Sequence, residues 1–407
     1  MGGASRYAGG DGRRLSEADT WLVEAGRRRA WTHGIVNPPL YRASTVLYET
    51  IAAMDAANRD VDANLYYGRK GTPTTWALRE ALTGLEPGAE GTMLMPSGVS
   101  AITAAILSCA KAGDHVLLPD SAYDPTSAFA DGLMRRFGIE PQWYDPLIGA
   151  GVAGLFRANT AALLLESPGS LTFEVQDVPA MAAVAREAGV VTILDNTWAT
   201  SLYFQGIRHG CDLVMQACTK YVVGHSDSML GSVTANAARW RDLQKTVWQL
   251  GLCVGADDAA LGLRGLRTMG VRLARHQESG LKVARWLAAH PLVDRVLHPA
   301  LESCPGHALW RRDFSGASGL FGVVLKAGSR ADAAHLCDGM RHFGLGFSWG
   351  GYESLMIPCS PERLRRVTRW QAPGLCLRLH VGLEDVGDLI ADLEAGLARF
   401  AAAVGGS

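Results

Sequence analysis

A carboxylate and an amine each follow a run of apolar residues near the middle of the chain. Asp195 comes directly after Val190–Leu194, and Lys220 comes directly after Asp212–Thr219. Because ligands of α/β proteins bind beyond the carboxyl ends of the strands, we expect both side chains at one edge of a sheet. An ordinary salt bridge between two strand ends is one interpretation, and a reactive amine with an acidic partner is the other.

The second interpretation matches the needs of pyridoxal 5'-phosphate (PLP). This cofactor requires a lysine that holds its aldehyde as an imine and a carboxylate that keeps its pyridine nitrogen protonated. The protonated ring can then accept the electron pair that remains when an α-proton departs. The lysine must also lose its charge to act as nucleophile and base, which burial or a nearby cation promotes. Lys220 and Asp195 are the candidates for these two positions.

Two further segments could complete such a site. Pro96-Ser97-Gly98-Val99-Ser100 opens a helix that we expect to run to about Ala110. A helix start made of small residues exposes backbone N–H groups to a phosphate, although a plain serine N-cap is the alternative. Tyr123 follows the expected strand His115–Pro119, where its ring could stack on a flat cofactor or pack at the domain surface.

The segment Gly149–Gly154 matches the GxGxxG pattern of dinucleotide-binding proteins. Such a site needs the pattern directly after a strand and at the start of a long helix. Here Asp145-Pro146 interrupts the chain before the pattern, and the helix can extend only to about Asn159. A nicotinamide-dependent oxidoreductase is therefore a rival interpretation with weak support, and a catalytically silent binding protein is another.

The elements that must position these residues indicate a large α/β domain followed by a smaller α+β domain. Residues 1–70 are expected to form an arm, which includes a helix over Ala18–Arg28. Residues 71–265 alternate short apolar runs with helical stretches, the pattern of a mostly parallel sheet covered on both faces. Residues 266–407 would form the second domain, with a last helix over about Glu384–Phe400.

Two runs in the second domain, Gly319–Leu325 and Leu375–Leu383, are expected to form half-buried strands. In the second run the leucines alternate with Cys376, Arg378 and His380, which would lie on the polar face. A guanidinium there suits a carboxylate ligand, and a solvated pair with Glu384 is the alternative.

The composition excludes several classes of partner. Lys and Arg number 39 against 40 Asp and Glu, so no overall field would attract nucleic acid or an acidic membrane. No segment is apolar enough to span a bilayer, and the N-terminal tail lacks the apolar run of a secretory signal. The 8 cysteines contain no CxxC pair, which suits a reducing cytoplasm. Cys304 and His307 form only half of a zinc-ligand pattern, so we expect no metal.

The chain resembles the Cys/Met-metabolism PLP enzymes, the family of cystathionine lyases and synthases, and within it most closely the bacterial β-lyase branch. The resemblance covers roughly residues 20–400 and rests on motifs in the family order. These motifs are Tyr67-Gly68-Arg69-Lys70-Gly71-Thr72, Glu166-Ser167-Pro168-Gly169, Asp195-Asn196-Thr197-Trp198, Thr219-Lys220-Tyr221 with Gly224-His225-Ser226-Asp227, and Ser348-Trp349-Gly350-Gly351-Tyr352-Glu353-Ser354.

The resemblance implies the PLP-dependent transferase fold of type I, like that of aspartate aminotransferase. It makes Lys220 the Schiff-base lysine, Asp195 the partner of the pyridine nitrogen and Tyr123 the residue that stacks on the ring. The phosphate would be held by Gly98, Val99 and Thr219.

The resemblance also implies a site shared between subunits. Tyr67 and Arg69 would reach into the neighbouring subunit's site, so the active unit would be a dimer within a tetramer. Arg378 would hold the α-carboxylate of a small amino-acid substrate, with Ser348 and Trp349 beside it.

Three positions bear on the branch of the family. Ala217 stands two residues before Thr219, where many relatives have serine, and this is typical of the β-lyases. Trp349 stands where the γ-acting relatives usually have leucine. Lys70 keeps the charge of the usual arginine but lacks its planar fork, which would loosen the grip on the distal end of a cystathionine-like substrate.

The expected reaction is β-elimination from cystathionine, which feeds methionine biosynthesis. Tyr67 or Tyr123 would accept a proton from the substrate amine, and Lys220 would take the α-proton. The products would be homocysteine, pyruvate and ammonia. The alternatives within the family are a γ-synthase, a γ-lyase and a general cysteine-S-conjugate β-lyase.

Overall fold

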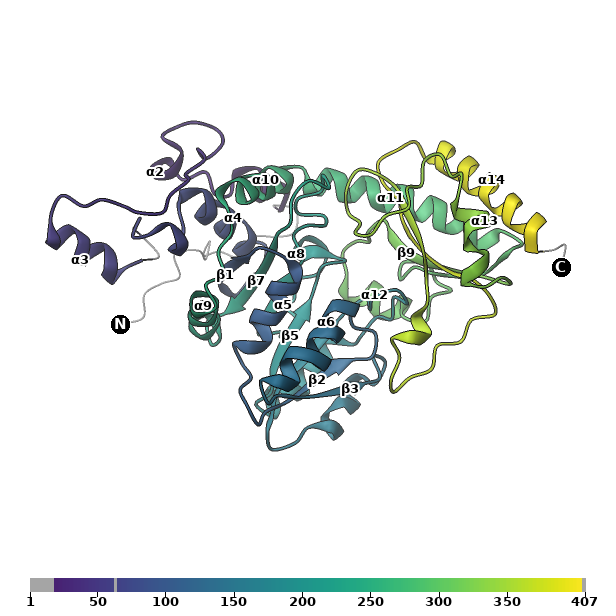
Figure 1. Cartoon of the computed structure of the whole chain (residues 1–407), viewed down its shortest axis with the longest axis horizontal. Coiled ribbons are helices and arrows are strands. Elements are labelled where there is room, and N and C mark those ends of the chain that lie inside the picture. Colours follow the sequence, from purple (N-terminus) through teal and green to yellow (C-terminus); the bar gives the residue numbers. More distant parts are fainter. Residues whose placement is uncertain (1–17, 62–63, 405–407) are drawn as a thin grey trace.

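The computed structural model describes residues 18–61 and 64–404, so the N-terminal tail lies outside the described residues. The helix expected over Ala18–Arg28 is shorter, because Gly26 with a φ of 72° ends it after α1 (Ala18–Glu24). Trp31 of α2 (Arg29–Thr32) packs on the large domain, 6.1 Å from Trp76 between ring centroids, whereas α3 (Ile51–Arg59) extends away from the body of the protein (Figure 1). Among the described residues, no helix combines the length and apolarity needed to cross a bilayer.

A 7-stranded sheet forms the centre of the large domain, in the order β1-β7-β6-β5-β4-β2-β3. All strands run in one direction except β7, which is antiparallel to both of its neighbours. The prediction of a mostly parallel sheet is therefore confirmed. The strands are β1 (Ala89–Met95), β2 (His115–Pro119), β3 (Glu140–Tyr144), β4 (Thr160–Glu166), β5 (Val191–Asp195), β6 (Leu213–Gln216) and β7 (Gly231–Asn236).

Helices cover both faces of this sheet, which explains the continuous apolar strands. Val116 and Leu118 of β2 pack in one apolar cluster with Ile102, whereas Leu117 packs on the opposite face with Met181. Successive strand residues point to opposite faces, so both faces need apolar side chains. The helices of this domain are α4 (Pro73–Thr83), α5 (Gly98–Leu107), α6 (Asp124–Phe129), α7 (Val178–Glu187), α8 (Thr200–Tyr203), α9 (Trp240–Gln249) and α10 (Ala256–Arg267).

The GxGxxG segment forms only the 3₁₀ helix η4 (Gly149–Leu155), which lies between β3 and β4. This short element ends at Phe156, whose backbone is extended. The segment therefore lacks the long helix whose N-terminus would bind a dinucleotide.

A second, antiparallel sheet follows, in the order β10-β11-β9-β8. Its strands are β8 (Val293–Leu297), β9 (Leu320–Leu325), β10 (Leu355–Cys359) and β11 (Cys376–His380), and its helices are α11 (Met269–Ala289), α12 (His307–Asp313), α13 (Ala333–Cys337) and α14 (Val386–Val404). This is the predicted smaller α+β architecture. The division between domains at residues 265 and 266 stays a proposal.

The expectation that β9 and β11 are half-buried is wrong. One face of this sheet packs under α11 and α14, where Phe321 and Leu379 meet Leu393. The other face packs against the large domain rather than water, and Cys376 and His380 are only 4% and 1% exposed. Alternation in the sequence identified two faces but could not show that a second domain covers the polar one.

Candidate active site

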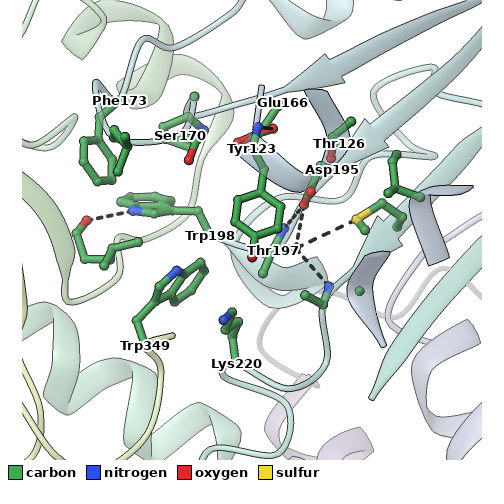
Figure 2. Close-up of a pocket in the computed structure, with 18 of the residues that line it drawn as sticks. Tyr123, Thr126, Glu166, Ser170, Phe173, Asp195, Thr197, Trp198, Lys220 and Trp349 are labelled. Carbon is green, nitrogen blue, oxygen red and sulfur yellow. Dashed lines mark hydrogen bonds between the residues drawn. The ribbon is translucent and has the colours of Figure 1, made fainter. Parts of the chain in front are cut away.

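A pocket lies at the carboxyl edge of the large sheet, where the small domain packs against it (Figure 2). Residues at or just beyond the ends of β4, β5 and β6 line it, together with a residue of β11 in the second sheet. Six residues predicted from the sequence line this pocket: Gly98, Tyr123, Asp195, Lys220, Trp349 and Arg378. Segments far apart in the chain thus converge on one cavity.

The Lys220 side chain reaches the pocket from the turn that follows β6. Its Nζ donates a hydrogen bond to Ser348 Oγ at 2.6 Å and lies 5.4 Å from the centroid of the Trp349 ring. The Lys220 pKa is lowered to about 8, chiefly by burial and also by the charge of Arg378, while the charge of Asp195 opposes both effects. A fraction of this amine is therefore neutral near physiological pH, as a nucleophile or base requires.

Asp195 lies at the end of β5, directly opposite Glu166 at the end of β4. The N–H and hydroxyl of Thr197 donate to Asp195 Oδ1 at 3.0 and 2.5 Å. Burial raises the Asp195 pKa, whereas these hydrogen bonds and the charge of Lys220 lower it.

Glu166 was not singled out from the sequence, although it opens one of the family motifs. Burial raises its pKa well above the usual range, and the neighbouring Asp195 charge raises it further. Two adjacent buried carboxylates cannot easily both ionise. Asp195 has the Thr197 donors and Lys220, so we assign the negative charge to Asp195 and the proton to Glu166.

Tyr123 is held by its backbone, whose N–H donates to Glu166 Oε2 at 2.8 Å. Its ring projects into the pocket beside Asp195 (Figure 2). Burial raises the pKa of the Tyr123 hydroxyl, and the charge of Arg378 opposes that rise. A planar ligand above Asp195 would therefore meet an aromatic face.

The helix α5 begins at Gly98, at the pocket. Ser97 and Ser100 form a capping box, in which each side chain accepts from the other residue's N–H. Gly98 and Val99 occupy the first turn, where the backbone N–H groups have no carbonyl partner within the helix. A Cβ on Gly98 would lie 2.6 Å from the Ala217 Cβ, so the close packing here requires glycine.

Thr219, the third predicted phosphate residue, does not line the pocket. Its hydroxyl donates to the Leu230 carbonyl at 3.1 Å and accepts from the Leu230 N–H at 2.9 Å. These bonds fix the turn that carries Lys220. The role of Thr219 toward a phosphate stays a proposal.

Arg378 enters the pocket from β11 and donates to the Ser348 carbonyl at 3.0 Å. Burial lowers its pKa, although a guanidinium stays charged at physiological pH. The solvated pair with Glu384 is not formed, because Glu384 accepts from the N–H and hydroxyl of Ser354. Arg378 is therefore a partly buried cation with donors available for an anionic ligand.

The turn at residues 348–350 joins these groups. Ser348 adopts a φ of 74°, which is uncommon for a residue with a side chain, and Gly350 follows at 86°. The Gly350 N–H donates to His380 Nε2 at 3.1 Å. This geometry aims the Ser348 hydroxyl at Lys220 and its carbonyl at Arg378.

An apolar wall completes the pocket, and most of it was missed. Phe173, Trp198 and Trp349 line it (Figure 2), and so does Leu320. The Trp198 indole N–H donates to the Leu320 carbonyl at 2.8 Å, which joins the two domains at this wall. Trp198 lies within a family motif, but Phe173 and Leu320 carried no chemical signal in the sequence.

The predicted residues of the arm, Tyr67, Arg69 and Lys70, do not line the pocket of their own chain either. Arg69 donates to the Trp248 carbonyl at 2.9 Å, and Lys70 Nζ lies 3.4 Å from the centroid of the Trp248 ring. Tyr67 is 42% exposed. Tyr67 and Arg69 line a separate cavity of about 500 Å³ beside Asp257.

The sequence model of the family described as Cys/Met metabolism PLP-dependent enzyme matches residues 19–398. The chain belongs to this family. Its members depend on PLP, and the pocket fits that cofactor: it offers an amine, an acidic pair, an aromatic face and the amides of a helix start. Charged and polar groups of this kind are what a PLP enzyme supplies around the ring and the phosphate.

Among its relatives, cystathionine beta-lyase of Escherichia coli is 45% identical over 94% of this chain and 98% of that protein. The enzyme of the same name from Salmonella typhimurium is 44% identical over 94% and 99%. An L-alanine/L-glutamate racemase from Wolbachia pipientis is 38% identical over 93% and 96%. Cystathionine gamma synthase from Xanthomonas oryzae pv. oryzae, solved with aminoacrylate and cysteine, superposes with a TM-score of 0.86 at 30% identity, over 95% of this chain and 99% of that one.

Proposed function

We propose that this chain is a carbon–sulfur β-lyase that cleaves cystathionine to homocysteine, pyruvate and ammonia. The observation that carries the proposal is the position of the Lys220 amine at the turn that also bonds Arg378. An amino acid held by its α-carboxylate on Arg378 would bind on the side of the pocket where Lys220 lies. The names of the relatives that cover nearly the whole chain support the same reaction.

When bound, PLP supplies an electron sink for the charge that develops at the α-carbon. Lys220 would carry the cofactor covalently and then, as a neutral amine, remove the α-proton. Arg378 would fix the carboxylate with its planar guanidinium. Tyr123, which lies in the pocket, or Tyr67 of a neighbouring subunit would accept the substrate's ammonium proton.

Trp349 favours β- over γ-elimination. The centroid of its indole lies 5.4 Å from Lys220 Nζ and 5.4 Å from the centroid of the Tyr221 ring, so packing fixes its position. The γ-reaction requires a second proton removal, at the β-carbon, and therefore a different pose. Because a misplacement of about 1 Å can cost about 100-fold in rate, one rigid wall residue can decide which bond breaks.

The substrate proposal predicts pyruvate and homocysteine as the dominant products from cystathionine. Cystine, which has the same number of atoms between its two α-carbons as cystathionine, should also be cleaved, because Lys70 offers the distal end of either substrate only a point charge. Product identity can be measured by chromatography of the 2-oxo acids and the thiols. Dominant 2-oxobutyrate and cysteine would establish the γ-lyase alternative instead.

Because one relative is a racemase, the rate of cystathionine cleavage should also be compared with the rate of L-alanine racemisation. Racemisation needs removal and return of the α-proton without loss of the β-substituent. L-alanine should therefore racemise much more slowly than cystathionine is cleaved. The opposite order of rates would contradict a lyase.

The low pKa of Lys220 predicts how the cofactor-free protein captures PLP. Lysine is unreactive while protonated, so the capture rate should rise with pH through about 8 and then level off. Replacing Arg378 with methionine removes a positive charge that lowers this pKa, so the midpoint should move to higher pH. Stopped-flow absorbance of PLP addition measures the profile.

The exposed Arg285 provides the control for that measurement. Arg285→Met should leave the midpoint unchanged. A wild-type midpoint near that of free lysine, roughly 10.4, would show that Lys220 is not the capturing amine.

The assembly and the compartment belong to the same proposal. Tyr67 and Arg69 line a cavity that is separate from the pocket of their own chain. In a dimer with shared sites, two of which would pair into a tetramer, these residues would serve the pocket of the neighbouring subunit. The cytoplasm suits the cysteines, all of which are free thiols.

A further inference from the structure

Two cysteines of the small domain face each other across neighbouring strands. Cys359 ends β10 and Cys376 begins β11, and the two residues are directly paired in the antiparallel register. Their Sγ atoms lie 3.2 Å apart. Residues paired in this way have Cα atoms roughly 4.5 or 5.5 Å apart, within the range that a disulfide spans.

A cavity gives small molecules access to this pair. It has a volume of about 280 Å³ and is lined by both cysteines together with Trp370 and Gly374. Cys359 is partly exposed there, whereas Cys376 is 4% exposed. A reagent that enters the cavity would therefore meet Cys359 first, and Cys376 would lie behind it.

We propose that Cys359 and Cys376 form an oxidation site, which a small-molecule disulfide converts into an intrachain disulfide. Cys359 Sγ attacks the reagent, forms a mixed disulfide and releases one thiolate. Cys376 Sγ then attacks Cys359 Sγ and releases the second thiolate. The two protein thiol protons pass to the two released thiolates, so one disulfide and two thiols are consumed and the same numbers are formed.

The surroundings set the rate of this exchange. The hydrogen bond to Cys376 and burial raise the Cys359 pKa, and the charge of Arg378 opposes that rise. Glu362, which lines the cavity, also raises the Cys359 pKa. Arg330 lines the same cavity. The thiolate is the attacking species, so the exchange should be slow near neutral pH and faster as the pH rises.

Formation of the disulfide between Cys359 and Cys376 would change the position of Arg378. This residue follows Cys376 by two positions on β11, so both side chains point to the face that packs on the large domain. The sulfur atoms must approach from 3.2 Å to about 2.05 Å, which draws the two strands together beside Arg378. This consequence rests on the proposed carboxylate-binding role of Arg378, whereas the closure itself does not.

The test treats the PLP-loaded enzyme with bis(2-hydroxyethyl) disulfide at mildly alkaline pH. Intact mass should show the loss of two hydrogens, and peptide mapping should find Cys359 joined to Cys376. The KM for cystathionine should rise about tenfold, less than the roughly 100-fold that a full 1 Å misplacement can cost. Dithiothreitol should reverse both changes.

Single-cysteine variants make the result specific. Cys359→Ser should keep its fold, because the residue is partly exposed, and should neither lose two hydrogens nor change KM on treatment. The exposed Cys253 gives the matched control, since Cys253→Ser should close like the wild type. If the pair stays reduced under conditions that oxidise the denatured chain, the proposal is wrong. Closure with an unchanged KM would overturn only the link to Arg378, and product identity would still test the lyase proposal.

Discussion

Replacing Lys220 with alanine is expected to lower kcat by at least about a thousand-fold, within the range that a positioned proton-transfer group contributes. The variant should also lose the covalent link to PLP. Both effects follow from one atom, because the same buried Nζ is the candidate for attachment and for proton transfer. Turnover of cystathionine and the visible absorbance of the bound cofactor measure them separately.

Borohydride reduction of the wild-type enzyme should place the pyridoxyl group on the peptide that contains Lys220. Lys282 is the matched control, because it lies on the surface and forms an ion pair with Glu278 of its own helix. Lys282→Ala should keep normal activity and normal labelling. A pyridoxyl group on another lysine, with Lys220 unmodified, would contradict the assignment.

The sequence predicted the core of this site because strand ends carry chemistry in α/β folds. Asp195 ends β5, and Lys220 follows β6 by a short turn, so two apolar runs with a polar residue after each were enough to bring them together. Arg378 was placed correctly in a strand by the alternation of leucines. These signals are local, and each depends on a few neighbouring residues.

The residues that were missed depend on contacts between distant segments. Glu166 becomes chemically informative only when β4 lies in register with β5, which raises its pKa beside Asp195. Phe173 and Leu320 meet only after the small domain packs against the large one. The burial of β11 on both faces has the same origin, so a pattern along one strand could not reveal it.

The arm poses the remaining question, because Tyr67 and Arg69 lie outside the pocket of their own chain. They line a cavity with Cys253 and Asp257, and α3 extends away from the body (Figure 1). In a symmetric dimer, arms of this kind can place side chains of each subunit in the site of the other. We therefore expect that each site combines Lys220 of one chain with Arg69 of the other.

Mixing two inactive variants tests this arrangement. Lys220→Ala and Arg69→Ala should each lose most activity alone. In a hybrid dimer, one site takes Lys220 from the Arg69→Ala chain and Arg69 from the Lys220→Ala chain, while the other site lacks both. Random exchange within a two-fold dimer makes half of the dimers hybrid, so activity should recover to about a quarter of the wild-type value.

The control mixture separates shared sites from any general effect of mixing. Asp195 and Lys220 line the same pocket of one chain, so a hybrid of Lys220→Ala with Asp195→Asn has no intact site. That mixture should stay inactive. Subunit exchange can be followed by mass spectrometry of differently tagged chains. If exchange is complete and the first mixture also stays inactive, each chain builds its own site, and Tyr67 and Arg69 must act by moving within it.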